Sequence, residues 1–366
     1  MRRRSPRLLV LIGLVAFAAP PRAQTAWING TVTDAETGAP LPGAHVFVSG
    51  TSRGDATDVG GRFVFRADAP GSVQVTATML GYGTATTTRL IRPGDVVGLA
   101  FRLPPVPLAL REVEVVRSRD AAWERALVRF RPEFLGETAN APLTEITNPE
   151  VLDLEADGDD GPLHAIARAP LVVENRALGY RVTFYDFALA VEENGRAWDG
   201  TLAFRDLCAE RLCGPAIAQA RERAYRGSLP HFLDALIWGT ASDEGFQSER
   251  VDRPGQATRA RLSVQPGRLS IRSARAPGPE VREAGAGWEA EIGGALRVLY
   301  TREFDPRVDA DAYQVSWLTA PGGALRLGPD GALLDAADVV RYGYWDWERV
   351  ADLVPLDYRP APPAGG

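Results

Sequence analysis

Residues that bind metal ions or form crosslinks are scarce in this chain. Of its 366 residues, three are histidine and two are cysteine. A zinc carboxypeptidase needs a His and a Glu three residues apart together with a distant His, so that one metal position stays open for water. The three histidines of this chain form no such pair, since the residues three positions later are not Glu: His45 and Val48, His164 and Ala167, His231 and Asp234. The sequence therefore argues against a zinc peptidase, and we expect neither a metal nor an organic cofactor.

Lysine is absent, and all 41 basic residues are arginine. The formal net charge is −6. Five of the arginines precede Gln24, so a chain without that segment is more acidic still. An acidic surface disfavours nucleic acid and anionic lipid as partners.

Long hydrophobic runs are missing beyond residue 24, and the run Leu8–Ala19 is too short to cross a bilayer. It follows four arginines in the first seven residues and is succeeded by small residues near Ala23 and Gln24. This layout is typical of a secretory signal. We predict that residues 1–24 are a signal peptide and that the mature chain lies in the periplasm or cell envelope, with an association with the outer membrane left open. No transmembrane helix is expected, and no cysteine follows the run to carry a lipid anchor.

From Trp27 to Val116 the sequence alternates as short β-strands do. Runs such as Trp27–Thr33, Ala44–Val48 and Arg62–Arg66 are β-branched or place apolar residues at every second position. Glycine, proline and aspartate separate these runs at roughly the 8–12-residue spacing of β-sandwiches. We predict a seven-stranded β-sandwich over residues 25–117, in a chain that is mainly β.

The turn residues of this stretch also form an ordered set, and the set resembles the carboxypeptidase regulatory-like family, whose fold is a transthyretin-like, carbohydrate-binding-like β-sandwich. The residues that carry the resemblance are Gly30, Thr37, Gly38, Pro40, Leu41, Gly43, Ala44, Gly50, Thr51, Gly54, Thr57, Asp58, Gly61, Phe63, Gly81 and Tyr82. Despite the family's name, the resemblance implies a non-catalytic module of the kind common in bacterial envelope proteins.

A second domain is predicted after the prolines at 104, 105 and 107. We expect Glu112–Val115 to form the last strand of the sandwich, residues 118–360 to form a mixed α+β domain, and residues 361–366 to be a disordered tail. The helices expected from capping and apolar spacing run from Ser118 to Arg131, Pro215 to Tyr225, Ser228 to Trp238 and Trp345 to Leu353. The strands expected are a hairpin around the turn Glu193–Gly195 and several short strands between Arg261 and Thr301.

Pieces of this region resemble an uncharacterised second domain that accompanies the regulatory-like module in envelope proteins of Bacteroidetes-type bacteria. The resembling pieces are Phe134–Gly136, Asn148–Pro149, Glu174–Asn175, Leu178–Tyr180, Ala224–Ser228, His231–Leu233, Gly245–Phe246, Val354–Pro355 and Asp357–Tyr358. The resemblance implies an architecture and no activity.

Two short motifs have simple structural interpretations. Cys208 and Cys213 are close together in an exported chain, which favours a disulfide that closes a small loop. Asp153, Glu155, Asp157 and Gly158 imitate the opening of a calcium loop. The twelfth position should hold Glu and holds His164, so a solvated acidic loop is the better interpretation.

Two clusters are the candidate binding residues. The first comprises Arg221, Tyr225, Arg226, Ser228 and His231, in which Ser228 precedes a histidine by three residues. A catalytic triad is hard to build there because Asp234, the available third member, would share one helix with His231. A helix-capping role for Ser228 is favoured. The second cluster contains Trp345 and Trp347, which either stack on a ligand or close a domain core.

Three functions fit these observations. The first is an exported, non-enzymatic envelope protein that binds a glycan or an envelope protein. The second is a metal-independent hydrolase of envelope material that uses two carboxyl groups as acid and base. The third is an accessory subunit of an outer-membrane uptake or secretion complex. An enzyme should have a concave pocket with converging carboxyls of shifted pKa, whereas a docking protein should have a shallow patch.

Overall fold

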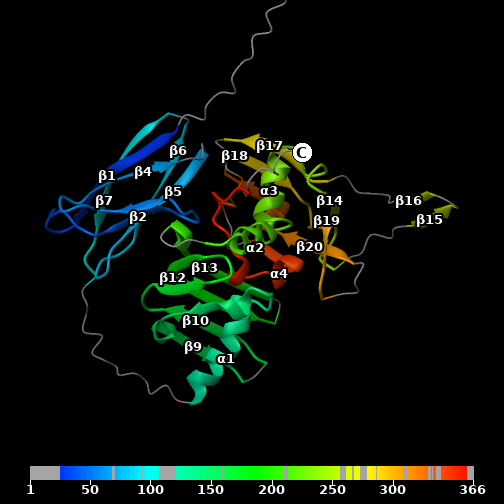
Figure 1. The fold of residues 1–366 in the computed structure, drawn as a ribbon, viewed down its shortest axis with the longest axis horizontal. Helices are drawn as coiled ribbons and strands as arrows, with labels where there is room; N and C mark the ends of the chain where they lie inside the picture. The colour runs from blue at the N-terminus through cyan, green and yellow to red at the C-terminus, as the bar shows by residue number, and fades with distance from the viewer. Residues whose placement is uncertain are drawn as a thin grey trace, which may run out of the picture.

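The computed structural model describes residues 25–67, 71–92, 94–106, 121–158, 160–193, 195–209, 213–255, 261–265, 268–272, 278–285, 287–307, 312–328, 331, 333–334 and 339–360. The proposed signal peptide, the strand expected at Glu112–Val115 and the C-terminal tail lie outside these residues. The described chain is mostly β and forms three modules (Figure 1), each with its own hydrophobic core.

The first module, called the sandwich, packs two sheets face to face. One sheet has the order β4 (Arg62–Ala67), β1 (Ala26–Asp34), β7 (Val96–Leu103), and the other β3 (Gly54–Ala56), β2 (His45–Val48), β5 (Gly71–Thr78), β6 (Ala85–Ile91). The burial of β4 alternates strictly along the strand, as its sequence predicts. Gly30 is required where β1 passes β7, because a Cβ there would lie 1.9 Å from the carbonyl oxygen of Leu99. The predicted seven-stranded sandwich is confirmed.

The second, or central, module is built on a six-stranded antiparallel sheet. Its strands are β8 (Thr144–Ile146), β9 (Leu152–Ala156), β10 (Leu163–Ala167), β11 (Leu171–Asn175), β12 (Tyr180–Glu192) and β13 (Gly195–Asp206). The long hairpin β12–β13 matches the prediction. Helix α1 (Ala121–Leu135) contacts β9 and β10, and α2 (Pro215–Tyr225) adds its buried face to the same core. Three short 3₁₀ turns cover Ala141–Leu143, Pro149–Val151 and Leu207–Ala209.

The prediction that the first helix ends before Pro132 is wrong, because α1 continues to Leu135. Pro132 removes one hydrogen bond from the helix. Packing outweighs that loss: Phe130 and Phe134 stack at 5.0 Å, and both are buried against the sheet.

The third, or distal, module has two sheets and one helix. The sheets have the orders β14 (Phe246–Val251), β19 (Ala295–Phe304), β20 (Tyr313–Thr319), β22 (Val340–Gly343) and β17 (Glu280–Ala284), β18 (Gly287–Glu291), β21 (Ala324–Leu327). Helix α3 (Leu229–Ile237) packs on them, and a separate hairpin joins β15 (Arg261–Gln265) to β16 (Arg268–Arg272). A 3₁₀ turn at Pro321–Gly323 precedes β21. The predicted helices at 215–225 and 228–238 are confirmed as α2 and α3.

The single closing helix expected from Trp345 to Leu353 is wrong. The chain forms the short helix α4 (Tyr344–Trp347) and then a separate 3₁₀ turn, η6 (Val350–Asp352). Arg349 between them has an extended backbone and donates to the carbonyl oxygen of Pro132 at the end of α1. The side chain is thereby anchored to the central module, and Val350 and Val354 enter its core.

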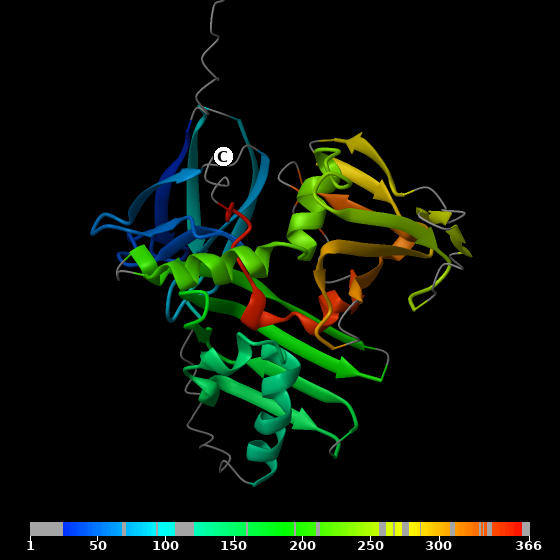
Figure 2. The same ribbon diagram turned by 45° about the vertical axis from the view of Figure 1, so that its right-hand side comes forward.

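The C-terminal segment, drawn in red, runs from the distal module past the central module to the sandwich (Figure 2). The sandwich is attached through the loop between β2 and β3. There Gly50 N–H donates to the Leu202 carbonyl at 2.8 Å, and Leu356 N–H donates to the Gly50 carbonyl at 2.9 Å. Asp357 accepts hydrogen bonds from the backbone and hydroxyl of Ser52 at 2.9 and 2.8 Å. Across the part of the chain that the structure describes, no helix combines the length and the apolar character needed to cross a bilayer.

Candidate functional site

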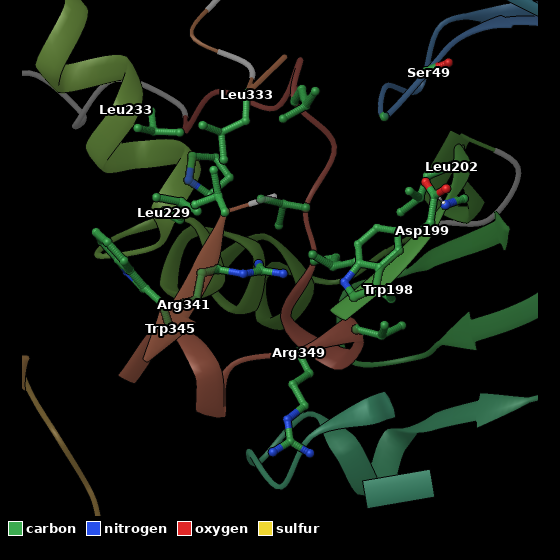
Figure 3. A pocket seen from close by; sticks show the side chains of 18 of the residues that line it. Ser49, Trp198, Asp199, Leu202, Leu229, Leu233, Leu333, Arg341, Trp345 and Arg349 are labelled. Carbon is green, nitrogen blue, oxygen red and sulfur yellow. Dashed lines mark hydrogen bonds between the residues drawn. The ribbon is translucent and has the colours of Figure 1, made fainter. Parts of the chain in front are cut away.

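Where the three modules meet, side chains enclose a cleft of about 470 Å³. The sandwich contributes the β2–β3 loop around Ser49, the central module contributes β13, and the distal module contributes α3 and β22 (Figure 3). The size falls in the range of small-molecule sites. The cleft is therefore the candidate functional site.

Most of the walls are apolar. On one side α3 presents Leu229 and Leu233, with Leu333 beside them, and on the other side β13 presents Trp198 and Leu202 (Figure 3). The ring of Trp198 packs edge-on against Phe184 at 5.8 Å, so the central core fixes its position.

A network of ion pairs closes one end of the cleft. Arg196 of β13 donates to Glu133 at 2.7 Å and to Asp346 at 2.6 Å. Arg349 lies 3.3 Å from the same oxygen of Glu133. The two arginines and two acids neutralise one another, and they connect β13, α1 and α4.

Arg341 is a charged lining residue of a different kind. It reaches from β22 across the cleft toward Trp198 (Figure 3). Its side chain makes no hydrogen bond or ion pair within the part of the chain that the structure describes. Burial lowers the pKa of Arg341, although Asp346 and Glu348 favour its charged form. An arginine remains protonated in proteins, so the cleft contains a positive charge that no described residue pairs with.

Glu348 is a lining carboxyl with a strongly perturbed proton affinity. Burial raises its pKa well above the usual range, and the neighbouring Asp352 and Glu303 raise it further. Asp352 is different, because it does not line the cleft and accepts hydrogen bonds from Thr138 and Asn140. Burial nevertheless raises the pKa of Asp352 to about 6.

The first cluster of candidate binding residues makes contacts within the protein, at the ends of β12 and β13 for Arg221 and around the junction of α2 and α3 for the others. Arg221 pairs with Asp206 at 2.7 Å and lies over the Tyr180 ring at 3.9 Å. Arg226 pairs with Glu222 on its own helix. Tyr225 is buried, and its ring lies 4.9 Å from that of His231. The structure brings these residues near one another, but not into the cleft.

Ser228 and His231 do not form a nucleophile–base pair. The Ser228 hydroxyl donates to the Tyr225 carbonyl at 2.7 Å and caps α3 by accepting from the His231 backbone N–H. The His231 Nδ1 accepts from the Gly227 N–H at 3.0 Å. Its Nε2 lies 3.6 Å from Glu244, and burial lowers its pKa. The geometry matches the capping role that the sequence favoured.

Trp345 lines the cleft and Trp347 does not. Trp345 is also anchored, because its indole N–H donates to the Gly227 carbonyl at 2.7 Å and its ring packs on Phe232. Trp347 is partly buried, with the Arg307 guanidinium 5.2 Å from its ring.

The disulfide expected of the first short motif is confirmed, but the acidic loop expected of the second is wrong, because its first two acids lie on a strand. Cys208 and Cys213 form a disulfide. Asp153 and Glu155 lie on β9, where Asp153 pairs with Arg168 and Glu155 is in register with His164 of β10. Among the described residues no group of three or more His, Cys, Asp or Glu side chains is arranged to hold a metal ion.

Sequence reasoning missed the residues that define the cleft, namely Trp198, Arg341 and Glu348. Arg341 lies in the otherwise apolar and aromatic run Val339–Tyr344, and this isolated charge was the available signal. The spacing of residues along one element does not show that three modules meet to form a cleft.

Residues 27–104 match the family model of the carboxypeptidase regulatory-like domain. The match covers the sandwich and confirms the resemblance found in its turn residues. No curated protein matches the chain.

Among solved structures, the chain is similar to a type II cohesin–X-dockerin complex from Acetivibrio cellulolyticus, with 23% identity over 21% of this chain and 52% of the other and a TM-score of 0.18. It thus spans about half the length of that match. A protein described as carbohydrate-binding from Bacteroides uniformis matches with 10% identity over 44% of this chain and 59% of the other, with a TM-score of 0.18. A protein described as membrane-associated from Bacteroides fragilis matches with 10% identity over 87% of this chain and 98% of the other, with a TM-score of 0.19. TM-scores this low support no inference about function.

Proposed function

We propose that this protein is an exported, non-enzymatic envelope protein that binds a ligand in the cleft between its three modules. The observation that carries the proposal is the cleft itself, which has mainly apolar walls, a fixed tryptophan and an arginine that forms no ion pair with the described residues. The site is concave instead of the shallow patch expected for docking. We therefore expect a small ligand, or a segment of a glycan or envelope protein, and not a large docking partner.

Binding fits the acids of the cleft better than hydrolysis does. A hydrolase without metal needs two carboxyl groups that face the substrate, one as acid and one as base. Glu133 and Asp346 are held by Arg196, and Asp234 lies 3.4 Å from Arg359. Asp199 is exposed and accepts the N–H of Gly200. Among the described lining residues, Glu348 therefore has no second carboxyl group beside it that is both buried and unpaired.

A panel of ligands tests the proposal by thermal unfolding of the purified chain. The panel contains oligosaccharides, aliphatic acids and short envelope-type peptides, and Leu334→Trp is the cleft-filling variant. Leu334 lines the cleft and is 56% exposed, so a larger side chain fits there without disturbing a core. We expect at least one class to raise the Tm of the wild type and not that of Leu334→Trp. No shift with any class, or equal shifts in both proteins, contradicts the proposal.

The hydrolase alternative keeps one observation in its favour, the raised pKa of Glu348, which suits a general acid. Mass spectrometry of the ligand recovered after incubation separates the two functions. An unchanged mass supports binding. A cleaved product that disappears with Glu348→Gln supports the hydrolase.

A further inference from the structure

We propose that the cleft binds an aliphatic carboxylate, with Arg341 holding the carboxylate group and the leucine-lined wall holding the apolar chain. This inference rests on the proposed function, because it names the chemical class of ligand for the same cleft.

The first support is the isolation of Arg341. Arg341 is partly buried in the wall of the cleft, where moving a charge out of water costs free energy unless a partner compensates it. Arg196 and Arg349, at the end of the same cleft, follow that rule and share Glu133. Arg341 has no such acid within ion-pair distance in the described chain. A ligand anion would supply the partner that the described residues do not.

The second support is the geometry of the guanidinium. Arg341 lies on β22, where it is in register with Leu318 of the neighbouring strand β20. The paired strand holds the backbone from which the side chain extends. The guanidinium points across the cleft toward Trp198 (Figure 3). A planar guanidinium can bind the two oxygens of a carboxylate through two parallel N–H donors.

The third support is the distribution of apolar surface around that charge. Leu229, Leu233 and Leu333 lie on one side of Arg341, and Trp198 and Leu202 lie on the other (Figure 3). The leucines among them offer no hydrogen bond to a sugar hydroxyl, and the polar lining residues Ser49, Gln74 and Thr88 come from the sandwich. One anionic group joined to an apolar body matches one cation surrounded by apolar walls.

Glu348 adds a second feature that suits a carboxylate. Its raised pKa favours the neutral acid, which can donate a hydrogen bond to an anion. A neutral Glu348 also leaves the charge of Arg341 uncompensated. The groups that face Glu348 are Asp352, Glu303, Arg307 and Arg341, and the acids among them oppose its ionisation.

The test compares dodecanoate with dodecanol by isothermal titration of the full chain, below the concentrations at which either probe aggregates. The variants are Arg341→Met, which keeps an unbranched apolar stem and removes the charged guanidinium, and Arg102→Met as a matched control. Arg102 is exposed on β7 and does not line the cleft. We expect dodecanoate to bind the wild type and the control, and to bind Arg341→Met about tenfold or more weakly, as for the loss of a charge-assisted hydrogen bond. We expect dodecanol to bind all three proteins equally weakly.

Unfolding without ligand provides the second measurement. Because Arg341 has no ion-pair partner among the described residues, we expect Arg341→Met to unfold at the same or a higher urea concentration than the wild type. A lower midpoint would show that Arg341 has a structural role and would overturn the inference.

The outcomes also separate this inference from the proposed function. Equal binding of dodecanoate and dodecanol, both abolished in Leu334→Trp, would retain a binding cleft and overturn the role of Arg341. Binding of an oligosaccharide or peptide but not of dodecanoate would also retain the function and overturn the ligand class. No binding of any probe, with wild type and Leu334→Trp indistinguishable, would overturn both.

Discussion

At the scale of single residues, the carboxyl groups around α4 and η6 make folding depend on pH. Asp352 is enclosed by the central module, and its hydrogen bonds from Thr138 and Asn140 only partly offset the desolvation that raises its pKa to about 6. The folded state therefore binds this proton more tightly than the unfolded state, where the pKa of an aspartate is near 3.8.

The sign of the resulting effect follows from linkage. Between about pH 4 and pH 6 the free energy of unfolding falls as pH rises, and the loss approaches about 3 kcal/mol. We expect Asp352→Asn to flatten this part of the pH profile, measured by urea unfolding at pH 4, 5, 6 and 7. Glu348 and Glu303, whose pKa values are also raised, contribute in the same direction, so the difference between wild type and variant is the quantity to compare. An unchanged slope in Asp352→Asn would show that Asp352 is not responsible.

At the scale of secondary-structure elements, the local rules of the sequence predicted α2, α3 and the β12–β13 hairpin. Ser228 is the informative case, because serine before a proline-containing first turn is a strong start signal and the structure shows the capping bond. The rules failed where packing or distant contacts decided the outcome. Pro132 was read as a helix end, but the aromatic stack in the core keeps α1 helical, and Arg349 interrupts the last helix through a contact with a segment far away in sequence.

The capping role of Ser228 has a measurable size. We expect Ser228→Ala to lower the free energy of unfolding by about 1–2 kcal/mol, since it removes the cap and a buried hydroxyl hydrogen bond. Ser242→Ala is the control, because Ser242 is exposed in the turn after α3. If Ser228 were instead a nucleophile, its replacement would abolish a hydrolytic activity and leave stability unchanged.

At the scale of the whole molecule, the sequence indicated the sandwich and a mixed second region, but not the two cores that the second region contains. Nor could it indicate the cleft, since Trp198, Arg341 and Leu233 come from three separate elements of two modules. In the first cluster of candidate residues, Tyr225, Ser228 and His231 contact one another at the junction of α2 and α3. Of all the candidate binding residues, Trp345 alone lines the cleft. Short spacing along the chain identified a structural junction, whereas the cleft depends on tertiary arrangement.

The attachment of the sandwich to the other modules can be weakened at one residue. Asp357 accepts two hydrogen bonds from Ser52 and lies 3.1 Å from Arg53. We expect Asp357→Ala to increase hydrogen exchange at the Gly50 amide, which faces Leu202, while the amide of Val46 inside the sandwich stays protected. Asp55→Ala is the control, because Asp55 is exposed on β3 of the same hairpin. Equal exchange at Gly50 in Asp357→Ala and wild type would show that the loop is held by its backbone contacts alone.

Because the walls of the cleft belong to three independently cored modules, an occupant that extends across the cleft would touch more than one of them at once. Such a molecule acts as a non-covalent crosslink, and its binding free energy is added to the interfaces and not to any single core. At a concentration a hundred times its Kd it would strengthen the assembled form by about 2.7 kcal/mol. The relative orientation of the modules then becomes a property that the cell can adjust through the supply of that molecule.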